Sequence, residues 1–156
     1  MAISPATIEP DFRVEVCEEL NQALAETTVT TMLAQNFHWN VTGIQFSQLH
    51  ELFQEVYEDH FEGQDVLAER VKALDGHADG NLSRMLERSG VREQFGQPTA
   101  VQMLEALLSA EETLAVTLKT CGERAASHGD TLTEDLCIAR GQVHEKFAWM
   151  LRAHLR

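Results

Sequence analysis

Apolar side chains recur at helical spacing in four long segments of the chain, about residues 11–41, 46–74, 99–126 and 131–155. The stripes consist of Val16, Leu20, Ala23, Leu24 and Thr27; of Leu49, Leu52, Phe53, Val56, Leu67, Val71 and Leu74; of Val101, Leu104, Leu108, Ala115 and Leu118; and of Leu132, Leu136, Ala139, Val143, Phe147 and Met150. Each pattern predicts an amphipathic helix that buries its apolar face. No proline lies between Pro10 and Pro98, which favours long helices.

Two of these segments begin with a helix-start signal. Thr99 stands three residues before Gln102, and Thr131 three residues before Glu134, so each pair matches a capping box. The first and second segments meet at residues 40–43, a turn-forming Asn-Val-Thr-Gly stretch. The first two helices are therefore expected to form an antiparallel pair.

The connection between the second and third segments, residues 75–98, is rich in glycine and too long for a tight turn. We expect one short helix in it, near Leu82–Arg88, capped by Asn81. A long middle connection lets the chain run back along a bundle, so the predicted fold class is all-α. The architecture is a ferritin-like four-helix bundle with a short extra helix between helices 2 and 3. Residues 1–156 form one domain, with 1–10 a short flexible N-terminal segment.

Charge is distributed unevenly along the chain. Its 25 acidic and 12 basic side chains give a formal net charge of −13. Residues 1–69 hold 13 of the acids and a single basic residue, Arg13. This balance argues against electrostatic binding to nucleic acid or to an anionic membrane, since both need clustered lysine and arginine.

Nothing in the sequence points to a membrane or a secretory route. No apolar run is long enough to span a bilayer, and the N-terminal residues lack the pattern of a secretory signal. Cys17, Cys121 and Cys137 are odd in number and show no metal-binding spacing, so we interpret them as small buried side chains in a reducing compartment. A cytoplasmic location is expected.

Four polar residues in the first half are candidate metal ligands: His38, His50, Asp65 and Glu69. The two carboxylates are four residues apart, on one helix face. The two histidines lie six residues either side of Ile44, so an antiparallel pair of helices puts them at the same height. Taken singly, a surface acidic pair and a histidine near a helix end are more often structural than catalytic.

Distance decides how these pairs can combine. His50 and Asp65 are fifteen residues apart, about 22 Å along one helix, whereas metal–ligand bonds are about 2 Å long. A single site made of all four residues must therefore lie between two subunits, on a two-fold axis. No histidine has Glu three residues before it, so the Glu-x-x-His motif of in-bundle di-iron centres is missing, and we expect no site inside the bundle.

The run HWNVTGIQFSQLHELF from His38 to Phe53, then Tyr57, and the run DVLAER from Asp65 to Arg70 resemble the Dps family, the mini-ferritins named as DNA-binding proteins from starved cells. The closing run HEKFAWMLR, beginning at His144, also resembles the last helix of that family. The resemblance covers residues 12–156. It implies a twelve-subunit cage that oxidises Fe(II), preferably with hydrogen peroxide, stores ferric mineral and protects against oxidative stress.

The resemblance also implies a ligand set. His38 and His50 of one subunit and Asp65 and Glu69 of its two-fold mate would form the ferroxidase site, with zinc as a substitute for iron. Some relatives have an acid one turn after the second histidine, where this chain has Gln54, which puts the affinity of a second iron in question.

The family pattern suggests further roles, each with a structural alternative. Trp39 would quench oxidising equivalents or simply pack, and Asp130, Glu134 and Asp135 would line a pore or cap the last helix. Gly63 is expected to mark a kink or a close approach. His60 and His77 are expected to be surface or loop residues, with a role as extra ligands as the alternative. The acids expected to face the cavity and attract Fe(II) are Glu55, Glu58, Asp59 and Glu62.

Two alternatives to the iron cage remain, a DNA-compacting cage and a plain helical bundle. DNA-binding relatives usually use a basic tail, but the first 20 residues hold five acids and only Arg13, so no DNA binding is expected. A plain bundle leaves the two matched ligand pairs unexplained.

Overall fold

The computed structural model describes residues 8–156, and this part of the chain contains five α-helices. They are α1 (Pro10–Asn40), α2 (Phe46–Ala73), α3 (Leu82–Arg88), α4 (Ala100–Ser127) and α5 (Thr131–His154). No strand occurs among these residues, and no helix in this range is both long and apolar enough to cross a membrane. The all-α prediction is confirmed, and each long helix begins and ends within one residue of its predicted bounds.

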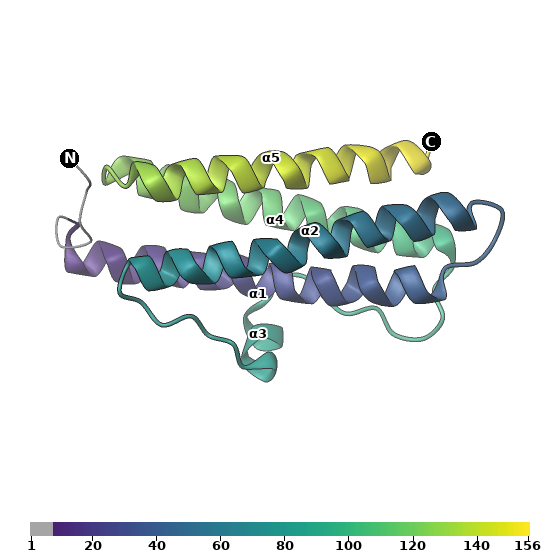
Figure 1. Ribbon diagram of the computed structural model, residues 1–156, viewed down its shortest axis with the longest axis horizontal. Helices are drawn as coiled ribbons and strands as arrows, with labels where there is room; N and C mark the ends of the chain where they lie inside the picture. Colours follow the sequence, from purple (N-terminus) through teal and green to yellow (C-terminus); the bar gives the residue numbers. More distant parts are fainter. Residues whose placement is uncertain (1–7) are drawn as a thin grey trace.

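The long helices form two hairpins, α1 with α2 and α4 with α5, which pack side by side (Figure 1). The chain leaves the end of α2, passes α3 on the outer side of α1, and returns to the other end of the bundle to begin α4 (Figure 1). The predicted long middle connection therefore does run back along the bundle, as in ferritin-like folds.

The helix starts agree with the sequence at α4 and differ at α5. The Thr99 hydroxyl accepts from the Gln102 backbone N–H at 3.3 Å, and the Gln102 side chain accepts from the Thr99 N–H at 2.9 Å, which completes the capping box. The predicted Thr131 cap is wrong by one residue. Asp130 is the N-cap, because its carboxylate accepts from the Thr133 N–H at 3.1 Å.

Asn81 precedes α3 as predicted, but its side chain donates to Asp79 at 3.1 Å and forms no cap bond. At the start of the described range, Ile8 is buried and Pro10 already begins α1. The predicted flexible segment otherwise falls on residues 1–7, outside the described residues.

The apolar interior consists of two clusters, one at each end of the bundle. The cluster near the α1–α2 turn includes Phe37, Leu49, Phe53, Leu107 and Leu151. The cluster at the far end includes Val16, Leu20, Leu67, Val71 and Leu118, together with the three cysteines, which are buried and free as expected. Each large buried apolar side chain contributes about 1.5–3 kcal/mol to folding. Along α2, α4 and α5 the two clusters are separated by a buried polar layer, described below.

Candidate functional site

His38 in the last turn of α1 and His50 near the start of α2 lie side by side. Their rings stack with centroids 3.7 Å apart. His38 Nδ1 lies 2.8 Å from the backbone oxygen of His50, and His50 Nδ1 lies 2.8 Å from that of His38. A carbonyl can only accept, so each Nδ1 carries a proton, and Nε2 is the atom of each ring that remains for a ligand. Metal-binding histidines are commonly held and oriented in this way.

The tight turn between α1 and α2 brings the two histidines into these reciprocal contacts. Gly43 has φ of 108°, a conformation that favours glycine, and it turns the chain between α1 and α2. Below the turn, Phe37 packs against Phe53 with ring centroids 5.9 Å apart, which fixes the two helices relative to each other. Tyr57 places its ring edge-on to His38 at 5.3 Å. The two imidazoles are thus held on a rigid scaffold, as a ligand pair requires.

Asp65 and Glu69 lie one helical turn apart on the exposed surface of α2. Among the described residues, the only group of three or more potential ligand atoms within 4.8 Å of one another is His60, Glu111 and His144. One chain therefore does not bring the four predicted ligands together. This agrees with the helix-length argument, which requires two subunits, but the intersubunit site itself stays a prediction.

Three large apolar side chains are exposed on the helices that carry these residues. Phe61 is 71% exposed and Val66 45% exposed on α2, and Trp39, the neighbour of His38 in the sequence, is 60% exposed. Trp39 therefore does not pack into the core of its own chain. Acidic side chains such as Glu58 and Glu62 are exposed on the same stretch of α2.

The structure does not support the roles predicted for two acidic residues, Asp59 and Asp130. Asp59 is not a free cavity residue, because Arg140 donates to it at 2.8 Å and 3.2 Å and the His60 ring contacts it at 3.0 Å. Burial acts to raise the pKa of Asp59, but the hydrogen bonds from His60 and Arg140 outweigh it and hold that pKa well below its usual range. Glu58 and Glu62 are exposed, as a cavity-facing role requires.

The Asp130 carboxylate also makes its contacts within its own chain. It is 3% exposed, caps α5, and pairs with Arg70 at 2.8 Å. The capping alternative therefore holds for Asp130, and its carboxylate is not available to a pore. Glu134 is half-buried and Asp135 is exposed, so these two remain candidates for the predicted pore lining.

His60 is the clearest error of the sequence interpretation. It was expected on the surface, yet it is fully buried and contacts the equally buried Glu111 through Nε2 at 2.8 Å. His77, by contrast, lies in the exposed connection after α2, as expected. Glu111 and His144 were not identified as site residues, although each is a polar residue on the buried face of its helix, and that signal was visible in the sequence.

Comparisons with known proteins agree with this fold and its motifs. The ferritin-like domain model matches residues 17–156. DNA protection during starvation protein 2 of Bacillus anthracis is 38% identical over 90% of this chain and 97% of its own length. DpsC from Streptomyces coelicolor superposes with a TM-score of 0.93 at 31% identity, covering 99% of this chain and 91% of that one.

The Dps protein from Vibrio cholerae O1, described as a member of a broad superfamily of ferritin-like diiron-carboxylate proteins, gives a TM-score of 0.91 at 28% identity. The alignment covers 96% of this chain and 94% of that one. Fold, helix bounds and sequence motifs thus lead to one conclusion: the chain belongs to the Dps family of ferritin-like proteins.

Proposed function

We propose that this protein oxidises Fe(II) at sites shared between two subunits and stores the ferric product inside a homo-oligomeric cage, for which the family implies twelve subunits. The observation that carries the proposal is the His38–His50 pair. Both rings donate through Nδ1 to a backbone carbonyl, which leaves Nε2 as the atom of each stacked ring that can bind a ligand. A metal ion is the ligand that suits two such nitrogens.

The proposed site is completed by Asp65 and Glu69 of the two-fold mate. Both carboxylates are exposed and one turn apart, so they can approach the imidazoles of a second subunit together. Imidazole and carboxylate together suit Fe(II), and zinc would compete for the same ligands. Glu69 anchors the more tightly bound iron, with Asp65 and one histidine completing its ligands.

Fe(II) is a substrate of this site and hydrogen peroxide is the proposed oxidant. Two Fe(II) ions each give up one electron, the O–O bond breaks, and two protons complete two water molecules. Both electrons pass within one site, so no hydroxyl radical is released. The exposed Trp39 indole, next to His38, is placed to reduce a stray oxidising equivalent.

The second iron is expected to bind more weakly than the first. The residue one turn after His50 is Gln54, whose neutral amide donates to Glu58 at 2.7 Å. An amide supplies no negative charge to a cation, so the second position lacks the charge that a carboxylate would give it. Fe(II) titration under anaerobic conditions should therefore resolve one tight and one weak step per site.

The experiment that tests the proposal compares Glu69→Ala with Glu105→Ala. Both residues are exposed, but Glu105 lies on α4, which carries none of the four proposed ligands. Peroxide-dependent Fe(II) oxidation, followed by near-ultraviolet absorbance in the assembled protein, should fall at least about tenfold in Glu69→Ala and stay unchanged in Glu105→Ala. Equal rates in the two variants would contradict the assignment.

DNA compaction is the alternative function, and the names of relatives such as the Bacillus anthracis protein refer to DNA protection. The net charge of −13 opposes it, since α1 begins with Asp11, Glu15, Glu18 and Glu19 against a single Arg13. A plasmid gel shift at moderate salt should show no retardation by this protein. Protection of DNA by such a cage would then come from removing Fe(II) and peroxide.

A further inference from the structure

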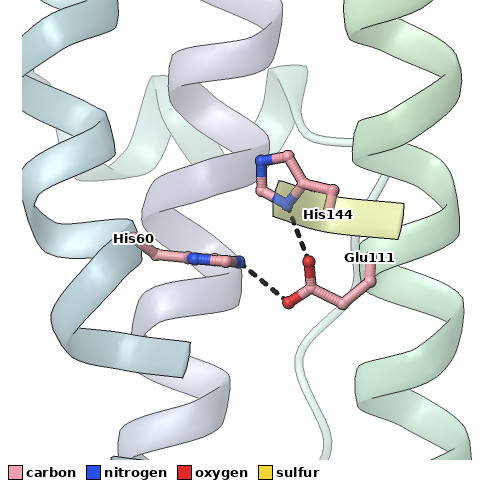
Figure 2. Close-up of side chains that lie close together, drawn as sticks. All are labelled: His60, Glu111 and His144. Atoms are coloured by element: carbon pink, nitrogen blue, oxygen red, sulfur yellow. Dashed lines mark hydrogen bonds and ion pairs between the residues drawn. The ribbon is translucent and has the colours of Figure 1, made fainter. Parts of the chain in front are cut away.

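Three polar side chains from three helices meet in the interior of a single subunit. His60 comes from α2, Glu111 from α4 and His144 from α5, and all three point toward one another (Figure 2). Glu111 contacts His60 Nε2 through one oxygen at 2.8 Å and His144 Nδ1 through the other at 2.7 Å. None of the three side chains is exposed. The cluster links the two helical hairpins between the two apolar clusters.

Fold stability alone gives no reason for this cluster. A buried ion pair is often no better than well-packed apolar residues of the same volume, because both charges lose their hydration. A mid-bundle position that apolar side chains could fill is instead occupied by three metal-binding groups.

We propose that His60, Glu111 and His144 form a second metal site, distinct from the intersubunit site, which binds one divalent transition-metal ion of the Fe(II) and Zn(II) class inside each subunit. Two histidines and one carboxylate are the donor set of open zinc sites and of mononuclear non-haem iron sites. One donor atom from each residue already lies within 4.8 Å of the other two. Metal bonds of about 2.1 Å place their donor atoms about 3 to 4 Å apart, so small shifts of the side chains suffice.

The missing Glu-x-x-His motif argues against an in-bundle di-iron centre, but it does not exclude a site for a single ion there. Three donors can hold one ion and leave at least one coordination position open. The site therefore differs from the di-iron centre of ferritin-like bundles in both metal count and ligand set.

The surrounding residues are arranged as metal sites usually are. His60 Nδ1 contacts the Asp59 carboxylate at 3.0 Å, which leaves Nε2 toward Glu111 as the ligand atom. Asp59 is in turn held by Arg140. Gly63 makes this possible, because a Cβ there would lie 2.8 Å from Arg140 Nη2, which confirms the predicted close approach at this glycine. A carboxylate–histidine pair of this kind fixes the ring and strengthens it as a ligand.

The charges within the cluster also suit a cation. Burial acts to raise the pKa of Glu111, but the contacts with His60 and His144 outweigh it and hold that pKa below its usual value. Burial lowers the pKa of His144. Both directions favour the forms in which a carboxylate and an imidazole bind a metal ion.

Cobalt(II) is the probe that tests this proposal, in the assembled Asp65→Ala/Glu69→Ala protein, where the intersubunit carboxylates are gone. After long incubation, because the cluster has no open path to solvent, we expect one Co(II) per chain that is lost when Glu111→Gln is added. Glu105→Gln, an exposed change on the same helix, should leave the count unchanged. An equal Co(II) count with and without Glu111→Gln would overturn the proposal.

A second measurement avoids any dependence on how the Glu111→Gln variant folds. Anomalous diffraction from crystals of the unaltered protein loaded with Co(II) should show a peak between His60 Nε2, Glu111 and His144 Nδ1. No peak at that position, with Co(II) present at the intersubunit histidines, would also overturn it. The proposal does not rest on ferroxidase activity, so a failure of Glu69→Ala to slow Fe(II) oxidation leaves it unaffected.

Discussion

The His38–His50 pair and the His60–Glu111–His144 cluster use the same kinds of side chain in opposite surroundings. The first lies half-buried at the end of a hairpin, and the carboxylates proposed to complete it are about 22 Å away along α2. The second is fully buried, and one chain supplies all of its groups. Substrate can reach a partly exposed half-site, which is completed only when subunits assemble. A buried cluster instead contributes to the stability of the fold. The two regions should therefore respond differently to mutation.

The largest expected difference is in stability. Glu111→Ala removes the buried carboxylate that contacts both His60 and His144, and it should lower the free energy of unfolding by about 3–5 kcal/mol. Glu69→Ala removes an exposed side chain and should change that free energy by less than about 0.5 kcal/mol. Chemical denaturation of both variants, in the absence of metal, measures the two values. A small loss of unfolding free energy in Glu111→Ala would mean that the contacts of Glu111 contribute little to the stability of the fold.

A smaller effect is expected when the whole buried cluster is replaced. The triple variant His60→Leu/Glu111→Leu/His144→Leu removes both charges together, so it should unfold within about 2 kcal/mol of the unaltered protein and could be more stable. Added Zn(II) should raise the thermal midpoint of the unaltered protein more than that of the triple variant, which keeps only the intersubunit ligands. An equal rise in both would show that Zn(II) acts elsewhere.

The smallest effect concerns the pH dependence of stability at Asp59. Its pKa in the folded protein is below the ordinary value of about 3.9, so the ionised group stabilises the fold above that pH, and the contribution declines as the pH falls. The difference in unfolding free energy between the unaltered protein and Asp59→Asn should thus be constant near neutral pH and narrow below about pH 4. A difference that widens on acidification would contradict the ion pair with Arg140 and His60.

The sequence predicts the helices well because their signals are local. The 3.6-residue stripes and the Thr99 cap depend on neighbours within one or two turns, and the structure confirms them. The pairing of His38 with His50 was also predictable, since a short turn fixes the register of two antiparallel helices.

The remaining features depend on contacts between distant parts of the chain. His60, Glu111 and His144 come together only when two hairpins pack, and periodicity does not say which hairpin faces touch. For the same reason Asp59 was assigned to the cavity although Arg140, 81 residues away, pairs with it. One clue was available: a glutamate on the apolar stripe of α4 requires a partner, and only a buried cation or metal supplies one.

The central claim is that two subunits build one iron site, and co-assembly of two inactive variants tests it most directly. One variant carries His38→Ala/His50→Ala and the other Asp65→Ala/Glu69→Ala, each with a different tag. Random pairing makes half of the dimers mixed, and each mixed dimer has one intact site out of two, so co-expressed cages should regain about one quarter of the unaltered oxidation rate. Either variant alone should stay inactive. No recovery in cages shown to contain both variants would contradict the intersubunit site.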